Sequence, residues 1–118
     1  MNIQIFGTKK CNETRKAQRF FSERGVTFHF KDISNKDQQI TKGELENISR
    51  VIPLEDLLDK EGKQFQKRNM QYMVFDYRQE LLEDQLLFKT PIVRNGNKVT
   101  LGVNTQVWSD WIQESKKT

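Results

Sequence analysis

The strongest structural signal of the chain lies in residues 2–21, NIQIFGTKKCNETRKAQRFF. Its first part alternates apolar and polar residues up to Gly7, which predicts a short strand that ends in a turn. Its second part, from Asn12 onward, carries apolar residues at helical spacing and contains no helix breaker. Cys11 is therefore predicted at the junction of a strand and a helix, at or just before the helix N-terminus.

Cys11 is the only cysteine of the chain, and this position favours a thiolate. Unpaired backbone N–H groups and the helix dipole stabilise negative charge at a helix N-terminus. Up to Lys31 the chain carries seven Lys and Arg residues against two acids, whereas the remainder carries thirteen against fourteen. The excess positive charge thus surrounds Cys11. We predict an exposed thiol with a lowered pKa; the alternative is an inert buried cysteine, as free cysteines often are.

The composition indicates one domain, residues 1–118, that folds without staples. A chain of 118 residues can bury a sufficient core. One cysteine and one histidine exclude an internal disulfide and argue against a structural zinc site. No apolar run approaches the roughly 20 residues of a membrane helix, and the first residues are predicted as a strand and not as a signal peptide. We expect a cytoplasmic protein without membrane contact.

The charge pattern also bears on nucleic acids as partners. A net charge of +4 is mild, and a nucleic-acid surface would need a stripe of interleaved basic and aromatic residues. No such stripe is visible outside the first predicted helix, whose aromatic residues are expected to be buried. We therefore do not expect nucleic-acid binding.

The residues after the first helix predict a second strand beside the first. The helix is expected to run to about Arg24 and to stop at Gly25 in a left-handed cap. Alternation over residues 26–31 predicts a strand that a right-handed crossover places parallel to the first. His29 lies on the polar side of this strand, and we interpret it as structural.

Residues 34–89 are predicted to form a helical insertion. Residues 34–39 form a polar loop, and the Thr41–Glu44 spacing predicts a capping box that starts a helix. Residues 54–58 suggest a short amphipathic turn. Residues 61–75 are interpreted as helical. Residues 70–75 are expected in the core; the alternative is that this dense apolar stretch covers a groove. Asp76 is interpreted as the cap of a further helix that continues through Gln85.

The last third of the chain predicts a hairpin and a helix. Residues 91–94 and 98–101 flank Asn95-Gly96-Asn97, which predicts a two-residue type I′ turn. Asn104 is expected to cap a helix with an apolar face that contains Trp108 and Trp111. The order β-α-β, helices, β-β-α predicts an α/β protein with the thioredoxin-like fold and a helical insertion between its second and third strands.

Three segments carry a family resemblance. Residues 5–17, IFGTKKCNETRKA, contain a Cys-x-x-(Ser/Thr)-Arg core. Residues 86–93, LLFKTPIV, approach a proline-initiated strand, and residues 52–59, IPLEDLLD, contain a Leu-Leu pair. Together with LGVN at residues 101–104, they resemble the arsenate-reductase-related family, which includes the Spx transcription regulators. The resemblance spans nearly the whole chain and implies the thioredoxin-like fold.

Departures from the family pattern bear on the reaction. The resemblance implies three further arginines that hold the oxyanion in the arsenate reductases, and the matching positions here are Asp59, Thr90 and Val103. Loss of these cations removes anion affinity, so we expect weak or absent arsenate reduction. Arg94 is a candidate substrate-binding residue displaced along the strand, and it is not an equivalent substitute. The Spx regulators use Cys-x-x-Cys; Thr14 stands at the second position here, so that internal disulfide switch is absent.

The resemblance implies a thiol-dependent reductase or thiol-transfer protein with Cys11 as the nucleophile. Arg15 would be the nearest charge partner of the thiolate, and Thr14 would either donate to the sulfur or cap the helix. Because no second cysteine exists, an external thiol such as glutathione or a glutaredoxin would resolve the adduct. We expect no bound cofactor and no metal.

The remaining candidate residues would hold the substrate. Lys9 and Lys10 are expected to stabilise the thiolate and to bind an acidic partner. The resemblance implies a cis peptide bond at Pro91, with the Thr90 backbone accepting an extended thiol substrate. The alternative function is a non-enzymatic, Spx-like module that contacts the transcription machinery or another protein. It would have an unreactive thiol and an exposed apolar or charged groove away from Cys11.

Overall fold

A four-stranded mixed sheet forms the centre of the protein, whose computed structural model describes residues 1–116. The strand order is β2-β1-β3-β4. Strand β1 (Ile3–Gly7) pairs in parallel with β2 (Phe28–Asp32) and antiparallel with β3 (Ile92–Asn95), which forms a hairpin with β4 (Lys98–Leu101). The predicted α/β protein with the thioredoxin-like order of elements along the chain, and with a helical insertion between the second and third strands, is confirmed. The last two residues of the predicted domain, 117 and 118, lie outside the described residues.

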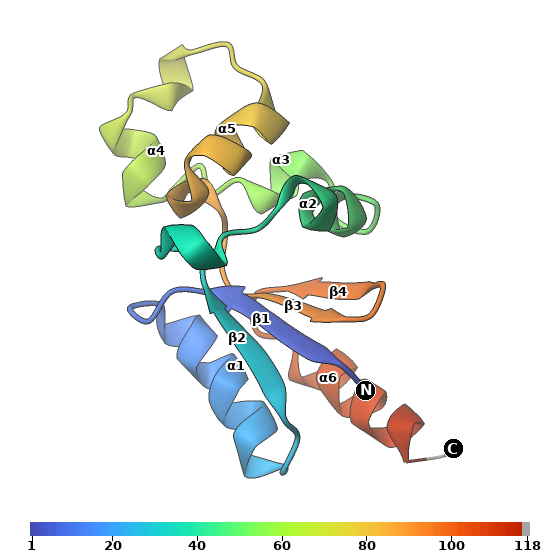
Figure 1. Ribbon diagram of the computed structural model, residues 1–118. Coiled ribbons are helices and arrows are strands. Elements are labelled where there is room, and N and C mark those ends of the chain that lie inside the picture. Colours follow the sequence, from blue (N-terminus) through green and yellow to red (C-terminus); the bar gives the residue numbers. More distant parts are fainter. Residues whose placement is uncertain (117–118) are drawn as a thin grey trace.

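Helices α1 (Asn12–Glu23) and α6 (Thr105–Ser115) cover one face of the sheet (Figure 1). Ile3 and Ile5, which alternate along β1, contribute their side chains to this layer. Gly25, with a φ of +67°, follows the C-terminal end of α1. Trp108 is fully buried beside the rings of Phe20 and Phe21, with centroids 5.3 Å away from each. Both tryptophans of the last helix are therefore core residues, as predicted.

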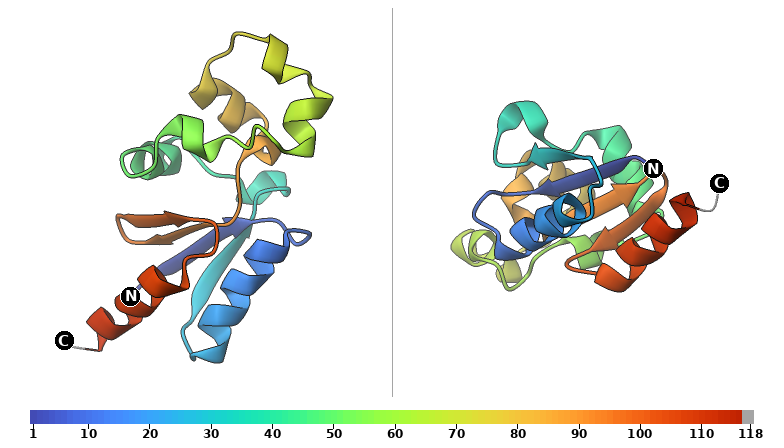
Figure 2. Two further views of the ribbon diagram at one scale, coloured as in Figure 1. Left: turned by 180° about the vertical axis from the view of Figure 1, so that it is seen from behind. Right: turned by 90° about the horizontal axis from the view of Figure 1, so that it is seen from below.

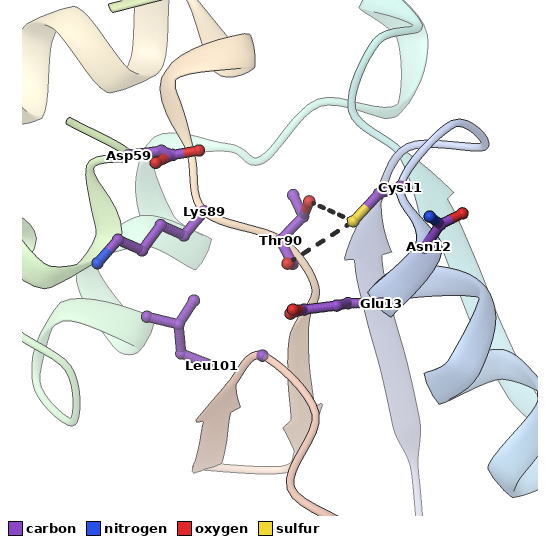
Figure 3. Close-up of a pocket in the computed structure, with 8 residues that line it drawn as sticks. Cys11, Asn12, Glu13, Asp59, Lys89, Thr90 and Leu101 are labelled. Carbon is purple, nitrogen blue, oxygen red and sulfur yellow. Dashed lines mark hydrogen bonds between the residues drawn. The ribbon is translucent and has the colours of Figure 1, made fainter. Parts of the chain in front are cut away.

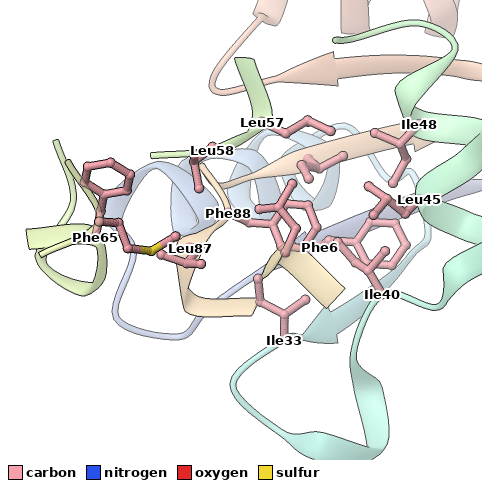
Figure 4. Close-up of a cluster of buried hydrophobic side chains, with 13 residues drawn as sticks. Phe6, Ile33, Ile40, Leu45, Ile48, Leu57, Leu58, Phe65, Leu87 and Phe88 are labelled. Carbon is pink, nitrogen blue, oxygen red and sulfur yellow. The ribbon is translucent and has the colours of Figure 1, made fainter. Parts of the chain in front are cut away.

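The helical insertion between β2 and β3 covers the opposite side of the sheet, as the view from behind shows (Figure 2). Its elements are η1 (Lys36–Gln38), α2 (Lys42–Ser49), α3 (Leu54–Leu57), α4 (Lys63–Lys67), η2 (Met70–Tyr72), α5 (Tyr77–Glu83) and η3 (Gln85–Leu87). Phe6 extends from the sheet into an apolar core shared with the insertion (Figure 4). Ile92 belongs to the same core. This second core includes Ile33, Ile40, Leu45, Ile48, Leu57, Leu58, Phe65, Met70, Leu81, Leu87 and Phe88.

Side-chain caps begin three of the helices where the sequence predicts them. Thr41 and Glu44 form the reciprocal capping box of α2. Asp76 accepts a hydrogen bond from the Gln79 N–H at the start of α5, and Asn104 caps α6. Local polar spacing therefore determines where these helices start.

The segment 61–75 differs from the prediction of one helix. Helix α4 ends at Lys67, and Asn69 adopts a left-handed conformation with φ 53° before the single turn of η2. Asparagine tolerates this conformation, so the helix is interrupted there. The expected burial is also wrong in part, since Met70 is buried whereas Tyr72 and Met73 are 84% and 46% exposed.

Three smaller predictions are corrected. The loop 34–39 contains the turn η1, and α5 ends at Glu83, before Gln85. The hairpin has the two-residue loop Gly96-Asn97, because Asn95 pairs with Lys98. Gly96 has φ +61°, whereas Asn97 has no positive φ. A type I′ turn needs a positive φ at both positions, and glycine at the first position alone is typical of type II′.

No helix among residues 1–116 is long and apolar enough to cross a membrane.

Candidate functional site

Cys11 occupies the N-cap position of α1, at the end of the loop that follows β1. Its backbone is extended, with φ −80° and ψ 116°, and its carbonyl accepts the Arg15 N–H at 3.1 Å. The Cys11 N–H donates to the Thr8 carbonyl at 3.2 Å and closes the loop. The sulfur therefore stands at the helix N-terminus, where the dipole favours an anion. The side chain is half-buried, neither fully exposed nor enclosed.

Thr90 is the closest partner of the cysteine, although 79 residues separate them in sequence. It precedes β3, which lies beside β1 in the sheet, and its bond to Pro91 is cis, as predicted. The Thr90 hydroxyl donates to Cys11 Sγ at 3.1 Å. The Cys11 thiol also lies 3.8 Å from the Thr90 carbonyl oxygen, to which it donates (Figure 3). Pairing of two neighbouring strands thus brings these residues together.

The surroundings of the sulfur favour its charged form. Burial raises the pKa of Cys11, but the Thr14 and Thr90 hydroxyls and the backbone N–H groups of Thr14 and Glu13 act against it. The net result is a pKa below the usual range of a thiol. Hydrogen bonds to the thiolate and the exposed N–H groups of a helix start are the physical causes.

Thr14 contributes from inside the first turn of α1. Its side chain is fully buried against Gly7, where the space for a Cβ is already filled by the threonine. Its Oγ1 has no hydrogen bond of ordinary geometry among residues 1–116. The Thr14 hydroxyl nevertheless lowers the pKa of Cys11, and it stands ahead of the Thr90 hydroxyl among the groups that do so. A buried hydroxyl without an acceptor is costly. The Cys11 thiolate is an acceptor to which this hydroxyl is free to donate.

An open cavity of about 520 Å³ lies over the sulfur, and we call it the cysteine cavity (Figure 3). Its charged lining residues are Glu13, Asp59 and Lys89, and the ammonium end of Lys89 points away from Cys11 (Figure 3). The Glu13 carboxylate lies over Gly102. The complete lining is Cys11, Asn12, Glu13, Asp59, Lys89, Thr90, Leu101 and Gly102. A volume in this range suits a small ligand or part of a larger one.

The structure does not bring all predicted site residues to this cavity. Lys9 and Lys10 are exposed on the loop and do not line it. Arg15 Nε donates to the Lys9 carbonyl at 2.8 Å, so the guanidinium fastens the loop to the helix. A charge pairing of Arg15 with the thiolate stays a prediction. Pro91 is buried behind Thr90 and does not line the cavity either.

Arg94 lies elsewhere, between the sheet and the insertion. Its Nη1 is 3.8 Å from Glu44 Oε2, and the same oxygen is 3.4 Å from Lys31 Nζ. The Arg94 side chain is 14% exposed and is not among the residues that line the cysteine cavity. A substrate role for Arg94 therefore gains no support from its position, which is that of a structural ion pair.

Several lining residues are absent from the sequence-based candidates. Asn12, Glu13 and Lys89 are direct neighbours of predicted site residues, so proximity in sequence was the available signal. Leu101 and Gly102 reach the cavity only because β4 returns beside β3. Of the three positions where the resemblance implies arginines, Asp59 and Thr90 line the cavity. Val103 is exposed and directly follows the lining residue Gly102 in the sequence.

The fold and this site define a thioredoxin-like protein with a single, polarised cysteine at a helix start. The model of the ArsC family matches residues 6–111, so the chain belongs to the ArsC family. A curated relative, the uncharacterized protein YusI of Bacillus subtilis (strain 168), is 28% identical over 109 residues, which cover 86% of this chain and 91% of YusI.

Solved structures agree with this assignment at the level of the fold. An arsenate reductase from Vibrio cholerae superimposes with a TM-score of 0.76 at 15% identity and covers 92% of this chain and 97% of its own. An arsenate reductase (ArsC) related protein from Brucella melitensis has a TM-score of 0.68 at 22% identity and 95% coverage of both chains. A protein named YFFB has a TM-score of 0.79 at 20% identity, with 92% and 96% coverage.

Proposed function

We propose that the protein is a thiol-dependent oxidoreductase of the ArsC family that uses Cys11 as its nucleophile. The observation that carries the proposal is the hydrogen bond from the Thr90 hydroxyl to Cys11 Sγ, 3.1 Å long, at the mouth of an open cavity. This contact lowers the pKa of the thiol, and only the thiolate attacks a disulfide. Membership of the family supports a thiol-based reaction.

The reaction that this site supports is an exchange of disulfide bonds. The Cys11 thiolate attacks one sulfur of a substrate disulfide, the Cys11–sulfur bond forms, and the other substrate sulfur leaves as a thiolate that takes a proton from water. An external thiolate then attacks the substrate-derived sulfur of the adduct and releases Cys11. The external thiol then stands in a mixed disulfide with the substrate sulfur, and a second external thiolate attacks it, which releases the reduced substrate and a disulfide of the two external thiols. The two electrons that reduce the substrate therefore come from two external thiols, one from each.

The external thiol is proposed because the chain cannot supply one. Cys11 is its only cysteine, so resolution depends on a second molecule such as glutathione or a glutaredoxin. The cysteine cavity is open to solvent and has a volume that admits a small thiol.

Arsenate fits this cavity poorly. An oxyanion is held best by arginine forks, whereas Glu13 and Asp59 present carboxylates to the cavity and Lys89 is the cation in its lining. We expect arsenate turnover to be weak or absent even with glutathione and a glutaredoxin supplied. Robust turnover would mean that a cation from outside the lining, such as Arg15, reaches the site.

The test combines reactivity with turnover. Iodoacetamide alkylation of Cys11, followed against pH by mass spectrometry, is expected to reach half its maximum below the pH of about 8.5 that a free cysteine requires. Reduction of a neutral disulfide with glutathione, with the Cys11→Ser variant as control, measures turnover. An ordinary alkylation profile without turnover would contradict the proposal and favour the Spx-like interaction module.

A further inference from the structure

We propose that the disulfide substrate is carried on a polypeptide with basic residues near its cysteine and an apolar side chain further along. This inference rests on the proposed function of Cys11. It follows from two hollows of the insertion that continue the cysteine cavity across the surface, one acidic and one aromatic.

The first hollow adjoins the cysteine cavity directly. It has a volume of about 350 Å³ and shares Asp59 and Lys89 with that cavity. Its lining includes four carboxylates, which belong to Glu55, Asp56, Asp59 and Glu61. We call these four residues, with Lys60 and Lys89, the acidic hollow.

The charges of the acidic hollow are not balanced within it. Lys60 Nζ already pairs with Glu55 Oε1 at 2.9 Å. The three other carboxylates of the hollow are then matched by a single positive charge within it, that of Lys89. Glu13 adds a further carboxylate on the cavity side. Unpaired carboxylates at one surface attract a cationic segment and repel phosphate-bearing molecules, which disfavours nucleic acids and anionic lipids.

The second hollow continues from Lys60 and is aromatic. We call it the aromatic groove; it is lined by Phe65, Met70, Met73, Phe75 and Tyr77 together with the polar residues Lys60, Gln66 and Gln71, and its volume is about 390 Å³. Phe75 stacks on Tyr77 with ring centroids 4.9 Å apart, and Lys60 Nζ lies 5.7 Å from the Tyr77 ring. Flexible methionines beside fixed aromatic rings are suited to an apolar side chain.

The order of these surfaces indicates the kind of ligand. Shared residues connect the three hollows in the sequence cysteine cavity, acidic hollow, aromatic groove. A small thiol occupies only the first, whereas an extended chain reaches all three. A polypeptide that is bound through its cysteine at Cys11 therefore places basic residues over the acidic hollow and an apolar side chain in the aromatic groove.

The covalent step is the exchange already described, with the peptide cysteine as the attacked sulfur. The probes are short synthetic peptides whose single cysteine is joined to a thiopyridyl group as a mixed disulfide. Attack by Cys11 forms the Cys11–peptide disulfide and releases thiopyridone, which is followed by its absorbance in the near ultraviolet. Dipyridyl disulfide, without any peptide, serves as the small neutral reference for every protein variant.

Two features of the peptide are varied independently. In one series, the lysines beside the cysteine are replaced by glutamates. In the other, a phenylalanine that lies several residues before or after the cysteine is replaced by serine. We expect the first change to lower the rate roughly fivefold for each effective charge contact and the second about tenfold. At molar salt, where the screening length is about 3 Å, the first difference should vanish and the second should remain.

Protein variants locate the effect. The doubly substituted Asp56→Lys, Glu61→Lys protein is expected to prefer glutamate-bearing over lysine-bearing peptides, when each rate is divided by the rate of the same protein with dipyridyl disulfide. Glu46→Lys changes an exposed acid on α2 and is the control, which is expected to keep the preference for lysine-bearing peptides. Met73→Glu should remove the preference for phenylalanine. Val51→Glu is its matched control, since Val51 is 50% exposed and Met73 46%.

The outcomes separate this proposal from the proposed function. If Cys11 reacts with dipyridyl disulfide no faster than free cysteine, the proposed function itself fails. If that reaction is fast but all peptides react equally, the function stands and the polypeptide substrate is wrong. A concentration-dependent dimer in sedimentation that Met73→Glu dissociates, together with equal peptide rates, would assign the aromatic groove to a second copy of this chain and also overturn the proposal.

Discussion

Hydroxyl and backbone N–H groups, and not side-chain cations, are the stabilising partners that the structure places at Cys11 Sγ. The Thr90 hydroxyl donates at 3.1 Å, while the Arg15 guanidinium donates to a loop carbonyl. A neutral donor stabilises a thiolate over a short range and is little affected by salt, whereas a cation is screened. Reactivity of Cys11 should accordingly depend on Thr90 and vary little with ionic strength.

Thr90→Val tests this contact. Valine keeps the shape of threonine but cannot donate, so the pKa of Cys11 should rise. A net hydrogen-bond contribution of about 1 kcal/mol corresponds to a roughly fivefold slower alkylation near neutral pH. Rates of iodoacetamide alkylation against pH give the result, and Thr90→Ser, which retains the hydroxyl, is the control. An unchanged profile for the valine variant would leave the Thr14 hydroxyl and the helix terminus as the sources of activation.

Cys11→Ser addresses the alternative of an inert core cysteine. Because the side chain is half-buried at a helix cap, serine should change the free energy of unfolding by less than about 1 kcal/mol. Urea titration measures this change, and disulfide exchange should be abolished in the same protein. A loss of several kcal/mol would instead identify the sulfur as core material.

Among the elements, those that start with local side-chain caps were predictable. Thr41, Asp76 and Asn104 each accept a backbone N–H at the predicted helix start. These contacts join residues a few positions apart, so a single sequence contains them. The interruption at Asn69 was not predicted, because helix propensities at residues 61–75 do not show where one residue takes a positive φ.

The conformation of Asn69 gives a prediction for the turn between α4 and η2. Its φ of 53° strains a β-branched residue but not glycine. Asn69→Val should lower the free energy of unfolding by about 1–2 kcal/mol, whereas Asn69→Gly should be nearly neutral. Thermal or urea unfolding distinguishes the two variants. Equal stability of both would mean that this turn is not held in the left-handed conformation.

Across the whole molecule, Glu44 joins the sheet to the insertion. Its carboxylate lies near Lys31 on β2 and Arg94 on β3, and one of its oxygens accepts the Thr41 N–H at 2.9 Å. Arg94 Nε has no hydrogen-bond partner among residues 1–116, and the guanidinium forms an ion pair with Glu44 through Nη1. This cluster joins three elements distant in sequence, which explains why Arg94 was assigned to the substrate from sequence.

Glu44→Gln measures that cluster. Glutamine preserves the size and the capping acceptor but removes the charge, so a half-buried guanidinium loses its counter-ion. We expect the free energy of unfolding to fall by about 1–2 kcal/mol. Glu46→Gln, on an exposed position of the same helix, should change it by less than about 0.5 kcal/mol. Equal effects of the two substitutions would show that the cluster contributes no specific stability.

The Cys11–Thr90 pair was accessible from sequence for a different reason. The resemblance assigned both residues to one site, although nothing local relates a helix cap to a residue 79 positions away. The acidic lining from Glu13 and the contribution of β4 could not be obtained in that way. They depend on how the hairpin and the insertion close over the helix start.

The flanking of β1 by β2 and β3 has a consequence for protein engineering. The insertion leaves the sheet from β2 and returns to it at β3, and both strands neighbour β1. Strand spacing of about 4.8 Å puts its two attachment points only about 10 Å apart. Residues 34–89 therefore form one contiguous segment, a cassette, whose two ends lie close together at the sheet. Chimaeras that exchange this cassette between relatives would recombine one nucleophile with different recognition surfaces.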